Sequence, residues 1–184
     1  MLQSFLYDNV QISLHGKRNA HLWLTGSFLC SLNHLAVLNL SESAGKVRNS
    51  EVYIEGAKFT PPDRYAVDKA FGDYIVGCHR DWETRGVLEL AAFALWGLTH
   101  VHPFEDGNGR TARVAAYFVM CRKYGMWLPG RTTILQQIRQ EPREYYAGLQ
   151  HATEAVVSRG APDLVPLQTM LGRYLEIQLD SSRV

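Results

Sequence analysis

Long apolar segments joined by short polar ones make up most of the chain. Residues 22–40 form a mostly apolar run, residues 63–79 place apolar side chains at helical spacing, and residues 87–98 are apolar on nearly every face. A helix that is apolar all round is typical of the buried centre of a bundle. The pattern therefore predicts three helices over these ranges, with the third at the centre.

More apolar segments follow a short polar loop. Pro103 disfavours the helical conformation for the residue before it, so the central helix must end near His102. The run RTARVAAYFVMCRKYG predicts another buried helix, and Gly125 is suited to end it. Two further helices are predicted over 141–157 and 163–180, separated by the loop RGAP.

The segment between the first two predicted helices has a different pattern. Residues 52–54 are strand formers, the Glu-Gly pair at 55–56 favours a turn, and residues 57–60 can form a returning strand. Two prolines at 61–62 would end that strand. The fold class that we predict is therefore mainly α, a compact helical bundle with one short β-hairpin.

Composition and charge predict a single domain that spans residues 1–184. The 184 residues are 46% hydrophobic, which is enough to bury one sizeable core. Nineteen basic residues against eighteen acidic ones leave a formal charge of +1. Such a balance gives no general attraction to nucleic acid or to an anionic membrane, so we expect neither as a partner. Any anion site must be local.

The cysteines and the N-terminus predict a cytoplasmic location, although translocation as an effector stays open. Cys30, Cys78 and Cys121 are odd in number, far apart and without a CxxC pair, so no disulfide framework or zinc cluster is predicted. The start MLQSFLYDNVQ lacks a cationic region followed by an apolar run, and Asn33 and His34 interrupt the longest apolar segment. We therefore expect no signal peptide and no membrane span.

The dozen residues HPFEDGNGRTAR concentrate polar chemistry between the two most apolar helices. Free N–H groups at the start of the second helix attract anions, together with the helix dipole. Gly107 and Gly109 permit positive φ, so we expect Asn108 inside an anion-binding backbone nest. Arg110 and Arg113 can both project from the first helical turn, and two arginines suggest more than one phosphate.

A metal ion and a general base complete this set. Mg²⁺ keeps several waters when it accompanies a polyphosphate, so one loop carboxylate suffices, and Asp106 is the candidate. His102 stands at the end of the preceding helix, where an imidazole can take a proton from a hydroxyl at neutral pH. These are the components of a phosphoryl or nucleotidyl transferase.

Simpler interpretations exist for each component. A lone histidine at a helix end is more often a structural hydrogen bonder, and the two arginines can be a solvated face. The glycines around Asn108 can form a plain helix–helix turn. An EF-hand loop is excluded, because Tyr117 stands where the final Glu ligand is needed, counting from Asp106. The coincidence of all components in one loop favours a functional site.

The same twelve residues carry a resemblance to a known family. HPFEDGNGRTAR resembles the Fic signature, His-x-Phe-x-(Asp/Glu)-Gly-Asn-Gly-Arg-x-x-Arg, and matches every defined position. AGKVRNSEVYIEGAKFTPP is similar to the family's flap hairpin, and REYYAGLQHATE is similar to the helix that borders the nucleotide base. The resemblance covers roughly residues 30–155, as the core of a Fic-like domain.

The resemblance implies transfer of AMP, in which a protein hydroxyl attacks the α-phosphate of ATP and pyrophosphate leaves. It implies His102 as the general base, Phe104 as the anchor of the loop and Asp106 as the ligand of Mg²⁺. The implied phosphate contacts are the backbone around Gly107, Asn108 and Gly109 and the side chains of Arg110 and Arg113, with Arg113 on the γ-phosphate.

The resemblance also implies a partner surface and a base pocket. A target protein is expected to dock on the hairpin 47–60 and to pair its backbone with an edge strand at residues 52–58; an exposed hairpin without a partner is the alternative. Tyr146 matches a tyrosine near the nucleotide, although on its own it is more often a core aromatic. Thr153 stands where many members carry an Asn that meets adenine, and a hydroxyl cannot replace an amide's paired donor and acceptor.

Control of the activity is less clearly encoded. Many Fic proteins carry a Ser/Thr-x-x-x-Glu-Gly/Asn helix whose Glu pairs with the second motif arginine, and this sequence has no such pattern. We then expect either that a separate small antitoxin-like partner supplies the inhibitory Glu, or that the enzyme is not inhibited by such a Glu.

Two alternatives to AMP transfer remain: another transferred group, such as UMP, GMP, phosphate or phosphocholine, or a non-catalytic module that responds to nucleotide. Intact Gly107 and Gly109 lower the odds of phosphate or phosphocholine transfer, and His102 argues against the non-catalytic module.

Overall fold

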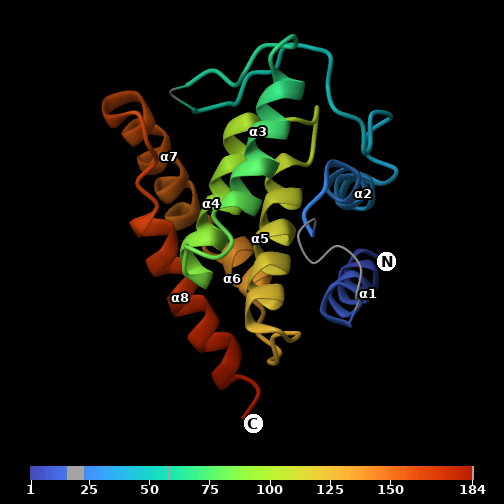
Figure 1. Cartoon of the computed structure of the whole chain (residues 1–184), viewed down its shortest axis with the longest axis vertical. Helices are drawn as coiled ribbons and strands as arrows, with labels where there is room; N and C mark the ends of the chain where they lie inside the picture. The colour runs from blue at the N-terminus through green and yellow to red at the C-terminus, as the bar shows by residue number, and fades with distance from the viewer. Residues whose placement is uncertain (16–22, 58, 184) are drawn as a thin grey trace.

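The computed structural model describes residues 1–15, 23–57 and 59–183, and the regular secondary structure within them is entirely α-helical (Figure 1). The helices are α1 Leu2–His15, α2 Gly26–Val37, α3 Val67–Arg80, α4 Val87–Val101, α5 Asn108–Tyr124, α6 Ile134–Gln140, α7 Pro142–Arg159 and α8 Val165–Asp180. None of these helices combines the length and the apolar character that crossing a membrane requires.

Helices α4 and α5 form the centre of the bundle. They pack along each other, α3, α7 and α8 cover α4, and α1, α2 and α6 cover α5. Figure 1 shows the pair between α7 and α8 on one side and α1 and α2 on the other. Both helices bury side chains around most of their circumference, which is why their sequences show no polar stripe. The prediction of a central buried helix is confirmed.

The loop between α4 and α5 starts and ends with left-handed residues. His102 caps α4 with φ 52° and ψ 56°, and Pro103 follows it. Gly107 precedes α5 with φ 81°, a conformation that favours glycine. At the other end of α5, Gly125 has φ 71° and ends the helix as its sequence position predicts. The two central helices are thus joined by a short loop that has a left-handed residue at each end.

Most of the predicted helices are confirmed, with shifted ends. The run predicted over 22–40 is helical only from Gly26 to Val37, because Thr25 caps it by accepting a hydrogen bond from the Phe28 N–H at 3.1 Å; residue 22 lies outside the described residues. Helix α6 was not predicted. It is only seven residues long, too short for a clear apolar period, and a capping box between Thr133 and Gln136 starts it.

The predicted hairpin is not confirmed, since no β-strand occurs among the described residues of 47–60. A turn does form at the expected place, where the Ala57 N–H donates to the Ile54 carbonyl at 3.1 Å. The strand formers at 52–54 have no paired strand beside them, so their propensity is not enough to make a ladder. We keep the name flap for residues 47–62, excluding residue 58, which lies outside the described part. Figure 1 shows it running across one end of the bundle.

Candidate active site

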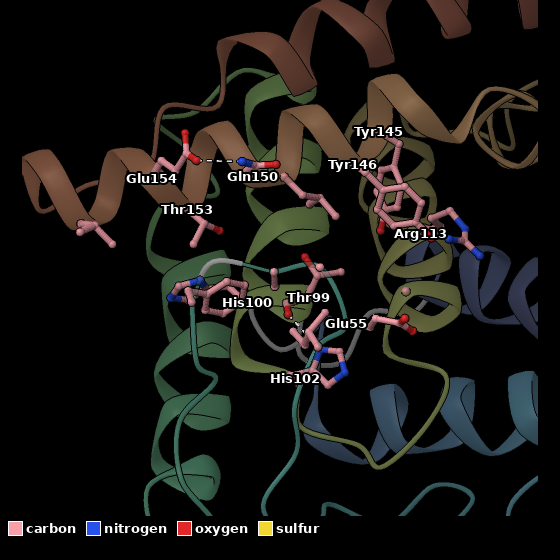
Figure 2. A pocket seen from close by; sticks show the side chains of 17 residues that line it. Glu55, Thr99, His100, His102, Arg113, Tyr145, Tyr146, Gln150, Thr153 and Glu154 are labelled. Atoms are coloured by element: carbon pink, nitrogen blue, oxygen red, sulfur yellow. Dashed lines mark hydrogen bonds between the residues drawn. The ribbon is translucent and has the colours of Figure 1, made fainter.

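A cavity of about 730 Å³ lies between α7, the facing ends of α4 and α5, and the turn of the flap (Figure 2). Its volume is in the range typical of small-molecule sites. The residues that line it are Ile54, Glu55, Gly56, Ala57, Phe59, Thr99, His100, His102, Gly109, Arg113, Tyr145, Tyr146, Leu149, Gln150, Thr153, Glu154 and Val157. The polar loop therefore opens onto this cavity through His102, Gly109 and Arg113.

His102 lines this cavity with a defined imidazole orientation. Its Nδ1 lies 3.1 Å from the Thr99 carbonyl oxygen, which can only accept, so Nδ1 carries the proton and Nε2 keeps its lone pair. Nε2 makes no hydrogen bond to the described residues. Burial lowers the pKa of His102, the hydrogen bond to Thr99 opposes that effect, and the positive charge of Arg48 lowers the pKa further. The imidazole is therefore neutral at neutral pH and suited to accept a proton.

Asn108 holds the loop together from inside the protein. Its Oδ1 accepts from the Phe104 N–H at 2.9 Å, and its Nδ2 donates to the Phe104 carbonyl at 2.7 Å. Both residues are buried, and neither lines the cavity. The Asn108 side chain therefore closes the loop into a ring. The anion-binding nest expected around it is formed by backbone groups and stays a prediction. Gly109 is also helical and not at positive φ, because it already belongs to the first turn of α5.

Gly107 is required by its surroundings as well as by its φ. A Cβ at this position would come within 2.4 Å of Cγ1 of Val37 and 2.9 Å of Nδ2 of Asn33. Asn33 is buried on α2, and its Nδ2 donates to the Asp106 carbonyl at 2.8 Å. No described side chain caps the N-terminus of α5, so its first N–H groups remain available to an anion.

Asp106 and Arg110 pair with each other beside the cavity. Nη2 of Arg110 lies 2.9 Å from Oδ2 of Asp106, and Nη1 donates to the Ala36 carbonyl at 2.9 Å. The Asp106 carboxylate is about half exposed at 53%. The described residues contain no cluster of three or more His, Cys, Asp or Glu side chains for a metal. A single exposed carboxylate still fits Mg²⁺ that is held mainly by phosphates and water.

Arg113 enters the cavity one helical turn beyond Gly109. Its guanidinium lies 5.7 Å from the ring centroid of Tyr145, which is a cation–π distance. Burial raises the pKa of Tyr145 to about 12, although the charge of Arg113 opposes this effect. The tyrosine hydroxyl is buried and makes no well-formed hydrogen bond to the described residues. Figure 2 shows both side chains at the end of the cavity where α5 begins.

The opposite end of the cavity is aromatic. The ring of His100 stacks between Phe59 of the flap and Trp96 of α4, with centroid distances of 4.7 Å to each. The Trp96 indole Nε1 donates to Oγ1 of Thr153 at 3.0 Å. Thr153 is buried, and its hydroxyl accepts this bond while its own O–H remains able to donate. Tyr146 lines the rim and is 63% exposed, which excludes the simpler expectation of a core aromatic.

The structure thus separates the predicted site residues into two groups. His102, Gly109, Arg113, Tyr146 and Thr153 share the cavity. The residues of the second group lie around it or beneath it, and they are Phe104, Asp106, Gly107, Asn108 and Arg110.

Sequence reasoning missed four residues that build the site: Asn33, Arg48, His100 and Tyr145. Asn33 and Arg48 bind backbone atoms of the loop from elements far away in the sequence. No spacing pattern reveals such contacts. Tyr145 adjoins Tyr146 in the sequence, and a choice between the two requires the helical phase of α7, which the pattern of apolar positions could have supplied.

Comparison with curated proteins finds protein adenylyltransferases. The protein adenylyltransferase fic-1 of Caenorhabditis briggsae is 37% identical over 108 residues, which are 58% of this chain and 19% of that protein. Protein adenylyltransferase Fic of Nematostella vectensis is 28% identical over 141 residues, 75% of this chain and 29% of that protein. The chain therefore spans between a fifth and a third of the length of these relatives.

Comparison with solved structures finds the same fold. A Fic domain containing signalling protein from Bacteroides thetaiotaomicron superimposes with a TM-score of 0.73 at 20% identity, over 99% of this chain and 71% of that one. Fic-1 of C. elegans gives 0.66 at 24% identity, over 96% and 48%. A model of the Fic/DOC family matches residues 23–120, more than half of the chain and the whole of the loop described above. On this match, the chain belongs to the Fic/DOC family.

Proposed function

We propose that the chain transfers AMP from ATP to a hydroxyl side chain of a target protein. The observation that carries the proposal is the position of His102. His102, whose Nε2 is unprotonated, lines the same cavity as Gly109 of the first turn of α5 and Arg113. A base beside an anion site is the arrangement that transfer of a phosphorus group to a hydroxyl requires.

The phosphates of ATP are assigned to the α5 end of the cavity. The free N–H groups at the start of α5 and the helix dipole attract them, and Gly109 lets the backbone approach closely because it carries no side chain. Arg110 would contact the phosphates once it exchanges its pairing with Asp106, and Arg113 would orient the γ-phosphate. Asp106 would hold Mg²⁺, whose charge offsets that of the phosphates.

The chemical step follows from these positions. The target hydroxyl gives its proton to Nε2 of His102 and forms a bond from its oxygen to the α-phosphorus. The bond from that phosphorus to the bridging oxygen breaks, and pyrophosphate leaves with the electron pair. The Thr99 carbonyl holds the other ring nitrogen, so it stabilises the imidazolium that forms.

The target is expected to lie along the flap. Tyr53 is 87% exposed, and residues 52–57 have no strand beside them among the described residues, so their backbone is open to pairing with an extended peptide. The base of the nucleotide would occupy the aromatic end of the cavity. The Thr153 hydroxyl accepts from Trp96 and cannot offer the base the paired donor and acceptor of an Asn amide, so UTP and GTP are co-substrates to test beside ATP.

The test is a labelling experiment with Mg²⁺ and ATP that carries ³²P at either the α- or the γ-phosphate. Three proteins are each incubated with a mixed cell lysate: wild type, His102→Ala and His15→Ala. The last is the control, because His15 is an exposed histidine on α1. Transfer of the α-label by wild type and His15→Ala but not by His102→Ala supports the proposal. Transfer of the γ-label alone would identify a kinase, and silence with ATP, UTP, GTP and CTP would favour a binding module.

A further inference from the structure

Arg48 is a buried arginine outside the sequence motif. It lies in the first arm of the flap, and only 3% of its surface is exposed. Its guanidinium donates to three backbone carbonyls: Nε to His102 at 2.8 Å, Nη1 to Ser50 at 2.8 Å and Nη2 to Pro62 at 2.6 Å. Its own N–H donates to the Pro103 carbonyl at 2.9 Å. Each carbonyl would otherwise need another donor.

These bonds join three segments of the chain at one side chain. Ser50 and Pro62 stand at the two ends of the flap, whereas His102 is the residue where α4 ends. Glu105 adds a second link, because its Oε1 accepts from the Ser50 hydroxyl at 3.1 Å. The flap has no strand ladder among the described residues to hold its arms together, so these side-chain bonds do that instead. The turn of the flap is thereby fixed opposite His102.

The bond to the His102 carbonyl has a particular consequence. A left-handed conformation is uncommon for a residue with a side chain and is retained only where the surroundings enforce it. His102 adopts it at φ 52°, and the direction of its carbonyl depends on that conformation. Arg48 holds the carbonyl while Thr99 holds the ring, so the imidazole is fixed at both its backbone and its Nδ1.

We infer that Arg48 is a positioning residue, which holds His102 in its left-handed conformation and fixes the flap across the cavity from it. Its effect on catalysis rests on the proposed transfer, whereas its effect on the conformation of His102 does not.

The guanidinium is suited to this role for a geometric reason. Its donors point in fixed, divergent directions within one plane, and they reach three carbonyls of separate segments together. A lysine would supply a charge of the same sign from a single nitrogen, and that one nitrogen could not reach all three carbonyls. Burial lowers the pKa of Arg48, and the carboxylates of Glu51 and Asp63 oppose that effect. The positive charge that lowers the pKa of His102 is therefore maintained.

Two substitutions separate the charge from the geometry. Arg48→Gln removes both, and Arg48→Lys keeps the charge but removes the fork. Arg64→Gln is the control, because Arg64 is an exposed arginine just beyond the flap. Two-bond ¹H–¹⁵N spectra of the histidine side chains, assigned with His102→Ala, give the pKa of His102, and its ¹³Cα shift reports the left-handed conformation. Neither readout requires nucleotide or activity.

We expect the ¹³Cα shift of His102 to move in both Arg48 variants. The pKa of His102 should rise in Arg48→Gln and rise less in Arg48→Lys, since the lysine keeps a positive charge nearby. In α-labelled transfer, kcat should fall about 10- to 100-fold in both variants, with the Kd of the nucleotide changed less than threefold. Arg64→Gln should match wild type in every readout.

Other results would contradict the positioning role of Arg48. An unchanged ¹³Cα shift, or a fully active Arg48→Lys, would overturn the role of the fork. So would a loss of activity that merely follows the fraction of unfolded protein, or two variants that both fail to fold, since Arg48 would then serve stability alone. If wild type transfers no nucleotide while the shift still moves, the proposed function fails and the positioning of His102 stands.

Discussion

The two ends of the cavity are built in different ways. At the α5 end the backbone itself forms the site, and side chains from inside the protein fix it: Asn108 closes the loop, and Asn33 holds the Asp106 carbonyl. At the aromatic end the site is formed by side chains, through the stack of His100 and the bond between Trp96 and Thr153. The first end depends on a long motif, and the second on residues scattered over three segments.

This difference has a functional consequence. The backbone groups of the α5 end are held in place by a few buried side chains, so one substitution that displaces the loop or removes the base alters the whole site. A site made of side chains can be altered one residue at a time. We therefore expect substitutions at the α5 end to affect the rate or the fold, and substitutions at the aromatic end to have smaller effects.

The largest effect is expected for His102→Ala. Removal of the base should lower the transfer rate about 10³-fold, because general-base catalysis contributes an effect of that order. The Kd of ATP should stay within about twofold, since the phosphate contacts remain. Transfer assays and calorimetry measure the two quantities, and His15→Ala is the control. A well-folded His102→Ala that loses nucleotide binding as well would contradict the assignment.

The rate of the wild-type enzyme should also depend on pH through His102. Its pKa is lowered by burial, so the neutral form persists below the ordinary value of about 6.5. Transfer should be level at neutral pH and fall only as the pH drops through this lowered pKa. The stability contributed by the buried neutral ring follows the same sign and is lost as the pH falls below about 6.5, because the unfolded chain then binds more protons. A transfer rate that already decreases with falling pH above pH 6.5 would contradict the lowered pKa of His102.

Gly107→Ala should reduce stability by about 3 kcal/mol in denaturant unfolding. The added Cβ meets Val37 and Asn33 at short distances, and the left-handed backbone is strained for any residue with a side chain. Gly56→Ala is the matched control, because Gly56 has φ 75° but nothing within 4 Å of an added Cβ. It should lose only about 1 kcal/mol. Equal losses would show that the packing around Gly107 is unimportant.

The sequence predicts the frame of this site better than its details. All-round apolar segments identify α4 and α5 because burial on every face leaves a simple pattern. The flap was predicted as a hairpin, since local propensity cannot show whether a second strand is present. The role of the Asn108 side chain is not predicted, because residue type alone does not distinguish a side chain that binds a ligand from one that closes its own loop.

Long-range contacts are the part that no local pattern contains. In the sequence, nothing distinguishes Arg48 from an ordinary charged residue before the strand formers at 52–54. Its hydrogen bonds nevertheless reach the carbonyls of residues 50, 62 and 102. The sequence predicts Thr153 as a departure from the family pattern, but its bond to Trp96 depends on how α4 and α7 pack. Such contacts require the tertiary structure.

Arg113→Ala should weaken binding of ATP about 30-fold and of ADP less than threefold. A charge-assisted contact to the γ-phosphate is of this order, and ADP lacks that group. Titration calorimetry with both nucleotides decides the matter, and Arg139→Ala, an exposed arginine on α6, is the control. Equal losses for the two nucleotides would place Arg113 elsewhere on the ligand and would weaken the contrast between the two ends of the cavity.

The smallest effect is expected at the aromatic end, for Thr153→Val. The substitution keeps the shape of the side chain but leaves the Trp96 indole N–H without its acceptor, so stability should fall by about 1 kcal/mol. The Kd values of ATP, GTP and UTP should each change less than twofold, because the hydroxyl already bonds to the indole and does not read the base. Thermal unfolding and calorimetry measure both effects. A tenfold loss for ATP alone would show that Thr153 turns from Trp96 to the base when nucleotide binds, and the aromatic end would then recognise adenine through this residue.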